Sequence, residues 1–594
     1  MNSTWTSAHQ IRHYIMDDPL LDWLELYGES KDFTRDKVQP VFLQYLSQQK
    51  NSFKNVVISD ITKKIPNYIE IDVSLPVRRR VAFTIDAMYL EYDMILRGGV
   101  FFNSSQLSSQ LSHLDPSSPS SGKDLPSFRN DSIQRGWYGI PDILIKADKI
   151  SKIFPNITLP EGKVNSYIPV TIAYSTLRFS QTDNTRLLQN QKLRYYQAFS
   201  QLLQQACHHT NKDISTDVPE TFTDTCGILI GRSTRRNNQW NYARIPYEID
   251  LLQKAIKGVT WIQHIQVSDA SRWELYPPSR PELYPNMRYC DEDYPWHETK
   301  KIIAQKLNDI TLLWQCGPQQ RIVAHQKGIF NWNQIDDTEV QLSLSAKKSQ
   351  IIDKIISINR SSDDSRLMIS PRKLKNHQNI QQLQSLPLEF YVDFETVQEV
   401  DETDNPSTST QNFLFMIGCV SRYQINSRDY HCEYKSFMVR DLIRTEEQRI
   451  TRDWIDYMSH FQKIFPKCQP KIFHWSPAEP VIYQQLTSKW GQILPVLPFV
   501  DLLQIFQKEP IVVRGAFSYS LKAVSRALYH HKYIQTLWRD DVVDGKDAMI
   551  RAWMCYQPEH SHQKKEVLGN IEHYNYVDCK VMEEIVSFIR EKLL

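Results

Sequence analysis

The stretch Phe390-Tyr-Val-Asp-Phe-Glu-Thr396 decides how the C-terminal part of the chain is interpreted. In an extended strand, residues two apart project to the same face, so Asp393 and Glu395 point together while their neighbours are apolar. Two like charges on a buried strand are costly unless a cation compensates them, and carboxylate oxygens are hard ligands that suit Mg²⁺ or Mn²⁺. The stretch therefore indicates either a metal-binding strand or an edge strand with two solvated acids.

Three further acids favour the metal-binding interpretation. Glu479 follows an apolar, strand-like segment and stands near the start of a predicted helix, and Asp501 ends another strand-like segment. Asp578 is expected at the start of a terminal helix over residues 578–593, whose apolar positions recur with helical spacing. Such carboxylates could gather around two metal ions about 3.5–4 Å apart, an arrangement that activates water and stabilises the leaving oxygen in phosphodiester hydrolysis.

The order of these acids resembles that of the DEDD 3′–5′ exonucleases, which have the ribonuclease H-like fold. The motifs that carry the resemblance are D-x-E at 393–395, a later strand–turn acid, and Y-N-x-x-D at 574–578. The resemblance implies that Asp393, Glu395 and Asp578 hold two metal ions. It also implies that Tyr574, four residues before the last acid, or His573, five residues before it, positions the attacking water. The Tyr-Asn pair favours Tyr574, because it matches the YprB-type branch.

Within that resemblance, the fourth metal ligand is either Glu479 or Asp501. The strand–turn–helix that begins at His474 matches the family's second acid position, although the family usually has aspartate where this chain has Glu479. Asp501 matches a downstream aspartate that is more often structural. We favour Glu479, since its extra methylene can be accommodated if the backbone sits back. His474 is expected either beside the metal ligands or as a satisfied core histidine.

The N-terminal half has the layout of a PD-(D/E)xK nuclease with parts missing. Asp142 in Gly139-Ile-Pro-Asp142 fits the first acid, and a strand at 167–174 follows. The second acid position holds Thr171 and the lysine position holds Ala173, so this centre is predicted to be inactive. Rescue by another acid, Asp148 or Asp183, is the alternative. A predicted helix over 187–206 carries residues that match the Q-x-x-x-Y motif of RecB-type nucleases, Gln191 and Tyr195.

Over roughly residues 80–594 the chain resembles one two-domain family, the predicted RecB-like nucleases with a C-terminal ribonuclease H-like exonuclease domain, and in particular its members from large DNA viruses. The resemblance implies an α/β fold in three parts. Residues 1–240 would form a degenerate PD-(D/E)xK (restriction-endonuclease-like) domain, 241–385 a helical connecting region, and 386–594 a ribonuclease H-like, mixed-sheet domain. Some RecB-type relatives hold an iron–sulfur cluster with one cysteine before the nuclease core. No cysteine precedes Cys207 here, so no such cluster is expected.

Composition limits the class of protein. The 594 residues include 70 Lys+Arg and 68 Asp+Glu, so any nucleic-acid site must be a local patch rather than a global charge. The longest apolar run, 413–420, is far too short to span a membrane, and the nine cysteines form no Cys-x-x-Cys pair. We expect a soluble, intracellular protein, in the host cytoplasm or nucleus if it is viral.

Polar segments indicate insertions and a domain boundary. Residues 103–127 are rich in serine and proline and predict a disordered insertion, and 401–412 predict a shorter acidic loop. The polar segment 360–379 is where we expect the main boundary. Between these segments, residues 298–314 show the apolar spacing of a packed helix.

Local basic groups are the candidates for phosphate contact, although each could equally be solvated surface charge. The sequence predicts a metal-dependent 3′–5′ exonuclease acting on DNA or RNA, with replication or repair proteins as further candidate partners and no membrane partner. The alternative is a non-catalytic nucleic-acid-binding or scaffold protein in replication or repair. The candidate contact residues are Arg78, Arg79, Arg80, Arg235, Arg236 and Lys522.

Overall fold

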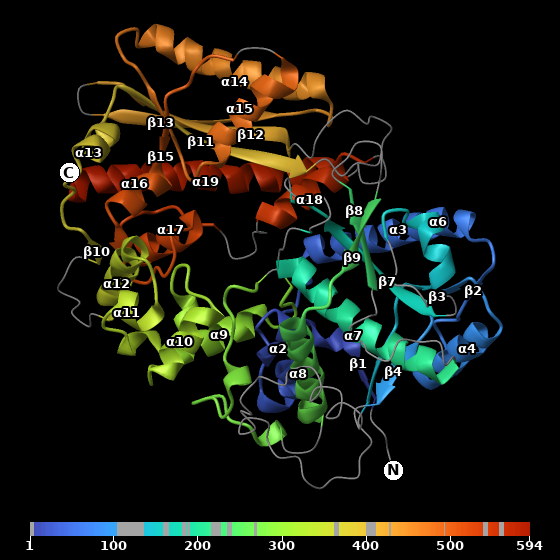
Figure 1. Ribbon diagram of the computed structural model, residues 1–594. Coiled ribbons are helices and arrows are strands. Elements are labelled where there is room, and N and C mark those ends of the chain that lie inside the picture. Colours follow the sequence, from blue (N-terminus) through green and yellow to red (C-terminus); the bar gives the residue numbers. More distant parts are fainter. Residues whose placement is uncertain are drawn as a thin grey trace. The chain divides into compact units, whose positions relative to one another are not determined.

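A computed structural model gives the fold of the chain, which divides into two compact units (Figure 1). Unit 1 comprises Met1–Lys37 and Leu46–Lys300, and unit 2 comprises Val38–Tyr45 and Lys301–Leu594. The expected 103–127 insertion and 401–412 loop fall, apart from Asn103 and Asn412, outside the described residues. The structure describes residues 5–103, 136–157, 166–180, 187, 191–214, 227–233, 240–266, 270–290, 292–360, 368–398, 412–426, 429–491, 494–538, 545–557 and 563–594.

Unit 1 is built on a mixed six-stranded sheet of order β2-β3-β6-β7-β8-β9. One face packs on α3 (Val41–Lys64), through Val57 and Ile61, and the other packs on α7 (Gln191–Ile214). Continuous apolar runs form the central strands because both of their faces are covered. The strands are β2 (Tyr68–Glu70), β3 (Met94–Leu96), β6 (Ile143–Lys146), β7 (Tyr167–Thr176), β8 (Gly227–Arg232) and β9 (Trp240–Ile245).

A smaller three-stranded sheet of order β1-β5-β4 completes the strands described for unit 1. Its strands are β1 (Trp5–Ser7), β4 (Val100–Asn103) and β5 (Gly136–Gly139). The unit also contains helices α1 (Arg12–Ile15), α2 (Leu20–Tyr27), α4 (Val77–Tyr89), α6 (Ile150–Ile153) and α8 (Ile249–Gln266), and α9 (His297–Leu307) begins at its C-terminal end.

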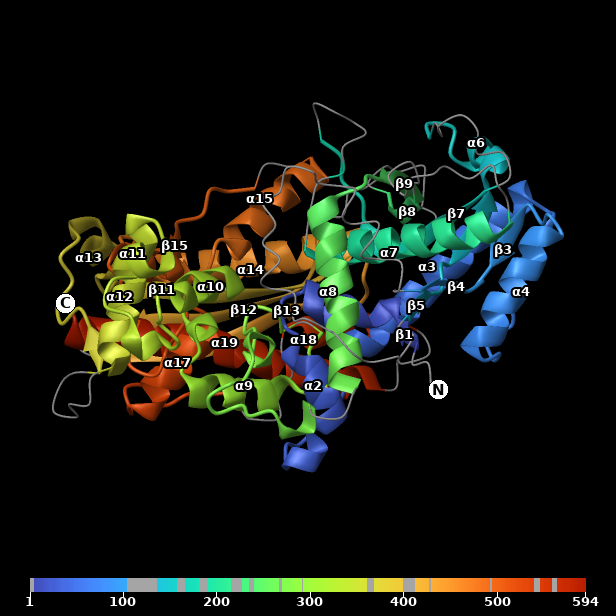
Figure 2. The same cartoon turned by 60° about the horizontal axis from the view of Figure 1, so that its bottom comes forward.

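Unit 2 is built on a mixed five-stranded sheet of order β13-β12-β11-β14-β15. β11 lies at its centre, antiparallel to β12 and parallel to β14. In both views α19 runs along one face of the sheet while α14 lies against the other (Figure 1, Figure 2). These elements are β11 (Leu388–Gln398), β12 (Asn412–Gln424), β13 (Tyr430–Met438), β14 (Lys471–His474), β15 (Phe499–Asp501), α14 (Arg444–Ile464) and α19 (Lys564–Lys592).

The alternation predicted for β11 determines which side chains reach α19. Phe390 and Val392 belong to the core that includes Trp454 of α14, whereas Tyr391 belongs to the core that includes Ile585 of α19. Because side chains alternate along a strand, Asp393 and Glu395 lie on the same face as Tyr391, toward α19. The central strand therefore presents its acids to the terminal helix.

The helices that precede this sheet pack with unit 2, so the division between units lies at Lys300 and not in the polar segment 360–379. Ile351 and Ile355 of α12 lie in one core with Phe506 and Val512. The strands and helices that share this core include α10 (Pro318–Gln326), α11 (Thr338–Leu342), α12 (Ala346–Arg360), β10 (Ile369–Ser370), α13 (His377–Leu383), α16 (Leu502–Lys508), β16 (Val512–Val513) and α17 (Leu521–His530). Two further helices, α15 (Ala478–Trp490) and α18 (Gly545–Cys555), pack in the core that includes Trp454 of α14.

Two predicted helices have different bounds in the structure. The helix predicted over 298–314 ends at Leu307, because Asn308 adopts a left-handed conformation (φ 50°) and Asp309 begins a new turn by accepting a hydrogen bond from Thr311 N–H at 2.8 Å. The terminal helix begins at Lys564, so Asp578 lies in its middle and not at its start. The prediction of an α/β fold is confirmed. Among the described residues, no helix is long and apolar enough to cross a membrane.

Candidate metal centre

Three of the predicted acids meet between β11 and α19. One carboxylate oxygen each from Asp393, Glu395 and Asp578 lies within 4.8 Å of the other two. Asp578 reaches the cluster from the middle of α19, and both it and Glu395 are buried, with 7% and 8% of their surface exposed. The spacing allows one cation to contact all three residues. The cluster can therefore bind a metal ion.

Burial and mutual repulsion make the ionised cluster unfavourable without a cation. Desolvation raises the pKa of Asp393 well above its ordinary value, and the charges of Asp578 and Glu395 add to the effect. Burial raises the pKa of Glu395 to about 7, and burial raises that of Asp578 too. The charge of Lys522 lowers the pKa of both Glu395 and Asp578 without offsetting their burial. A divalent cation would remove this cost directly.

Asn575, one turn before Asp578, fixes the orientation of Asp393. Its side-chain amide N–H donates to Asp393 Oδ2 at 2.7 Å, and its own Oδ1 accepts from the Tyr434 hydroxyl at 3.1 Å. The residue is fully buried, and Gly418 of β12 makes room for it: a Cβ on Gly418 would lie 1.4 Å from Asn575 Oδ1. Sequence reasoning did not assign these roles. A glycine inside the apolar strand 413–420 was the available signal, because such a glycine often indicates close approach of another segment.

Glu479 lies near the three acids, at the start of α15. Its charge acts on Asp393, Glu395 and Asp578, and burial raises its own pKa. Its Oε2 is buried without a hydrogen-bond partner. His474 Nδ1 lies 3.3 Å from this atom but also lies 2.6 Å from Ser476 O, to which it can donate. An orphaned buried carboxylate oxygen beside other acids fits a metal ligand.

Asp501 has a different role, although it lies close enough to affect the Glu479 charge. It is the N-cap of α16, and its Oδ1 accepts from Gln504 N–H at 3.2 Å and from Ser476 N–H at 3.3 Å. The carboxylate thus holds the helix end and the turn that leads to Glu479. Neither Glu479 nor Asp501 is in the group whose oxygens meet within 4.8 Å, so the fold brings together three of the four predicted ligands. Because Asp501 is committed to backbone N–H groups, Glu479 stays the candidate for the fourth.

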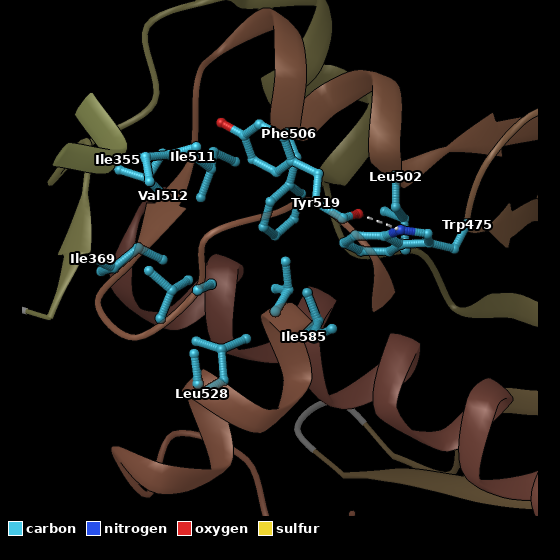
Figure 3. Packing of buried hydrophobic residues seen from close by; sticks show 14 of the residues in the cluster. Ile355, Ile369, Trp475, Leu502, Phe506, Ile511, Val512, Tyr519, Leu528 and Ile585 are labelled. Carbon is cyan, nitrogen blue, oxygen red and sulfur yellow. Dashed lines mark hydrogen bonds between the residues drawn. The ribbon is translucent and has the colours of Figure 1, made fainter. Parts of the chain in front are cut away.

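A hydrophobic core holds this part of the site in place (Figure 3). Trp475, next to the turn before Glu479, donates its indole N–H to the backbone oxygen of Tyr519 at 3.0 Å, and its ring contacts Phe506. Tyr519 precedes α17, which carries Lys522. The same core therefore positions the Glu479 turn and the Lys522 helix relative to each other.

The geometry of α19 distinguishes between Tyr574 and His573, the two candidates for positioning the attacking water. Tyr574 is buried and lies one turn before Asp578, so the two share a face of the helix, and Lys522 Nζ lies 5.0 Å from the centre of its ring. His573 is exposed and contacts the ring of Tyr576. Tyr574 and Lys522 therefore accompany the acid cluster, and His573 does not.

In unit 1, Asp142 is already engaged by protein groups. Its Oδ1 accepts from Lys54 Nζ at 2.7 Å, and its Oδ2 accepts from Ile172 N–H at 2.6 Å. Thr171 is buried and pairs with Ser200 at 3.1 Å, and Ala173 is buried in the core. Lys54, which the sequence did not single out, thus neutralises the one acid that remains of the motif.

The remaining residues of the degenerate N-terminal motif lie as follows. Gln191 begins α7, and Tyr195 is a buried residue of the same helix whose hydroxyl lies 3.5 Å from His9 O. Asp148 is exposed and pairs with Lys149, so it does not replace the missing acid. Asp183 lies outside the described residues. Within the part of unit 1 that the structure describes, Asp142 belongs to no group of three or more metal-ligating side chains.

Comparisons with known proteins find no relative for this chain. No family model, curated protein or solved structure matches it. What the chain does must therefore follow from the chemistry of its own residues.

Of the predicted phosphate contacts in unit 1, only some are available at the surface. Arg78 and Arg79 are exposed on α4, where the Arg78 guanidinium lies 5.4 Å from the centre of the Trp5 ring. Arg80 is buried instead, and its Nη2 donates to Arg97 O at 2.6 Å, so it holds the chain together and does not face solvent. The predicted contacts Arg235 and Arg236 lie outside the described residues.

Proposed function

We propose that the chain is a metal-dependent 3′–5′ exonuclease that hydrolyses phosphodiester bonds of DNA or RNA at the acid cluster of unit 2. The observation that carries the proposal is the convergence of Asp393, Glu395 and Asp578, each buried or half-buried, with one oxygen of each within 4.8 Å of the others. Buried carboxylates gathered without a compensating cation are costly, so they indicate a site built for a cation.

The donor set supports Mg²⁺ or Mn²⁺. All of the candidate ligands are carboxylates, which hard divalent cations prefer over softer metals, and Glu479 supplies a buried oxygen that lacks a hydrogen-bond partner. Two such ions, when bound, would supply an activated water and stabilise the leaving oxygen. The mixed sheet, with both D-x-E acids on its central strand, is compatible with the ribonuclease H-like fold that the sequence resembles.

The chain's own residues would divide the remaining work. Asn575 orients Asp393 through its amide, and the Tyr574 hydroxyl is proposed to orient the attacking water. Lys522, whose positive charge acts on the acid cluster, would attract the phosphate of the substrate. The 3′–5′ direction rests on the resemblance to the DEDD exonucleases. Unit 1, with Asp142 held by Lys54, would serve as a docking module for nucleic acid.

A cleavage assay tests the proposal. Single-stranded DNA and RNA carrying a 5′ label are incubated with the full chain and Mg²⁺ or Mn²⁺, beside the Asp393→Asn variant. We expect wild-type products that shorten from the 3′ end and no detectable cleavage by the variant. Asp441→Asn is the matched control, because its side chain is 71% exposed and lies outside the cluster. This control should cleave as the wild type does.

Two outcomes would contradict the proposal. Unchanged cleavage by Asp393→Asn, with the variant folded as judged by circular dichroism, would show that the acid cluster is not the catalytic site. Tight binding of nucleic acid by the wild type without cleavage of either substrate would instead support a scaffold protein.

A further inference from the structure

A second group of metal-ligating side chains lies in unit 1, in the short segment before α9. Cys290, Asp293 and His297 each offer one ligand atom, and the three atoms lie within 4.8 Å of one another. His297 Nδ1 lies 2.9 Å from Asp293 Oδ2, and Cys290 reaches the surface. A thiol, a carboxylate and an imidazole are thus presented together by eight consecutive positions of the chain.

Buried groups around this cluster hold the carboxylate in place. Lys300 Nζ, fully buried, lies 2.7 Å from Asp293 Oδ2 and 2.8 Å from Asp18 Oδ2, and it also donates to Asn286 O and Tyr289 O. Groups that contact a metal ligand fix its orientation. Asp293 itself is only 4% exposed, so its position is set by the fold.

The backbone at this point is fixed as well. Asp36 Oδ2 accepts from the backbone N–H of His297 at 2.8 Å, which anchors the first residue of α9. Asp293 O accepts from Trp296 N–H at 2.8 Å, which closes the turn between the two candidate ligands. These contacts hold Asp293 and His297, two of the three ligand-bearing residues, in fixed positions.

We propose that Cys290, Asp293 and His297 form a binding site for one Zn²⁺ ion in unit 1. A thiolate with an imidazole and a carboxylate is a donor set that Zn²⁺ favours, and spacings of three and four residues between the ligands match compact zinc sites. Three protein ligands leave the fourth tetrahedral position to water. The mixed donor set separates this site from the all-carboxylate cluster of unit 2.

Charge supports the assignment. Lys300 is shared between two carboxylates, Asp18 and Asp293, so it balances only one of them. When Cys290 is a thiolate, the site has three negative groups, which are that thiolate, Asp18 and Asp293. A doubly charged ion together with Lys300 would balance them. On binding, the thiol proton and the imidazolium proton leave to solvent.

Metal analysis of the full chain tests the site. The metal-free protein is incubated with Zn²⁺ in excess Mg²⁺, which competes for the carboxylate cluster, and bound zinc is measured after desalting. Binding of Co²⁺ is followed in parallel through the thiolate-to-cobalt charge-transfer band. We expect one equivalent of zinc and a clear charge-transfer band in the wild type.

Four variants identify the ligands. Cys290→Ser should lose the charge-transfer band, and Cys290→Ser and His297→Ala should each weaken zinc binding by about tenfold or more, since even residues that only orient a ligand contribute about that much. Cys432→Ser, which removes a thiol outside the cluster, and Asp393→Asn should bind as the wild type does. A wild type that binds no zinc, or a band that survives in Cys290→Ser, would overturn the proposal. Because Cys290 is exposed, its replacement by serine tests ligation without threatening the fold.

Discussion

At the scale of single residues, Gly418 sets how closely α19 can approach β12. A methyl group at this position would overlap Asn575 Oδ1 at 1.4 Å, so the Asn575 amide would have to leave Asp393. We expect Gly418→Ala to lower the affinity for Mn²⁺ by about 10–100-fold, the range found when groups that orient metal ligands are removed. The measurement is Mn²⁺ titration by calorimetry, with the cleavage rate followed in parallel.

Gly569 is the matched control for that substitution. It lies in α19, the helix that carries Asn575, and a Cβ there would meet nothing within 4 Å. Alanine is a better helix former than glycine by about 0.8–1 kcal/mol, so Gly569→Ala should raise stability slightly and leave metal binding unchanged. Wild-type affinity for Mn²⁺ in Gly418→Ala would show that Asn575 does not orient Asp393.

The pKa of Glu395 leads to a prediction about pH. Its value of about 7 in the metal-free fold lies above the ordinary 4.5, so between these values the native state binds a proton that the unfolded state has released. The free energy of unfolding of the metal-free protein should therefore fall as pH rises through this window, by on the order of 3 kcal/mol. Denaturant unfolding in a chelator, repeated with Mn²⁺, measures the effect.

Metal should reverse this trend, because the bound ion requires the ionised carboxylates. Stabilisation by Mn²⁺ should be larger at about pH 8 than at about pH 5. Glu395→Gln should weaken both the pH dependence in the chelator and the stabilisation by Mn²⁺. Equal stability of the metal-free wild type across the window would contradict the coupling of these acids to folding.

At the scale of elements, α19 presents Tyr574 and Asp578 on one face and turns His573 away. If the Tyr574 hydroxyl orients the attacking water, Tyr574→Phe should lower the cleavage rate by about 10²-fold or more, the usual contribution of a positioned acid–base group. The affinity for Mn²⁺ should not change, because the ring and the acids remain. His573→Ala is the control and should cleave at the wild-type rate; a larger loss in His573→Ala than in Tyr574→Phe would reverse the assignment.

Substitutions at Glu479, after the turn that follows β14, and at Asp501, at the start of α16, can distinguish a metal ligand from a helix cap. Asp501→Ala should lower stability by about 0.5–2 kcal/mol, as expected for a lost N-cap, with little change in Mn²⁺ affinity once folded. Glu479→Gln should show the opposite pattern, with weaker Mn²⁺ binding and stability unchanged or raised, since it removes an unfavourable buried charge. Thermal unfolding and Mn²⁺ titration of both variants decide which acid is the ligand.

Periodicity along the chain predicted some elements well and others poorly. Strand β11 was predictable because a period of two is carried by large apolar residues on one face, Phe390 and Val392, with acids on the other. The full length of α19 was not predictable, because Gly569 and the asparagines at 570 and 575 weaken the helical pattern of the sequence. Tertiary packing stabilises the helix despite these residues. The end of α9 at Leu307 depended on a single left-handed residue, which no periodicity reveals.

Contacts between distant segments could be predicted from the sequence only in part. The three carboxylates of the cluster could be proposed from their order along the chain. The pairing of Lys54 with Asp142 could not, because their positions lie 88 residues apart and nothing in the pattern of α3 indicates a partner. The Cys290 cluster was hidden for another reason: its cysteine stands alone, whereas the usual sequence signature of a cysteine metal site is a Cys-x-x-Cys pair.

At the scale of the whole molecule, the acids predicted from the sequence behave differently in the two units: among the described residues, those of unit 2 form a cluster and Asp142 of unit 1 belongs to none. In unit 2 several acids converge, and the positive charge that the protein places near them does not offset the cost of their burial. In unit 1 the single acid Asp142 is balanced by Lys54. A lysine ammonium supplies one charge and no open coordination position, so the contacts of Asp142 are those of a structural ion pair and not of a metal ligand.

This difference predicts how the two units respond to the same kind of substitution. Asp142→Asn keeps the size of the side chain and leaves Lys54 to solvent, in which it is already 39% exposed, so we expect the cleavage rate and the number of Mn²⁺ ions bound to stay at wild-type values. Asp393→Asn should abolish cleavage while leaving nucleic-acid binding intact, because the proposed docking module is unit 1. The decisive measurement combines both variants in one cleavage and binding series. Loss of cleavage in Asp142→Asn alone, with its fold intact, would mean that Lys54 assists an active centre in unit 1, and that the acid cluster of unit 2 serves another purpose.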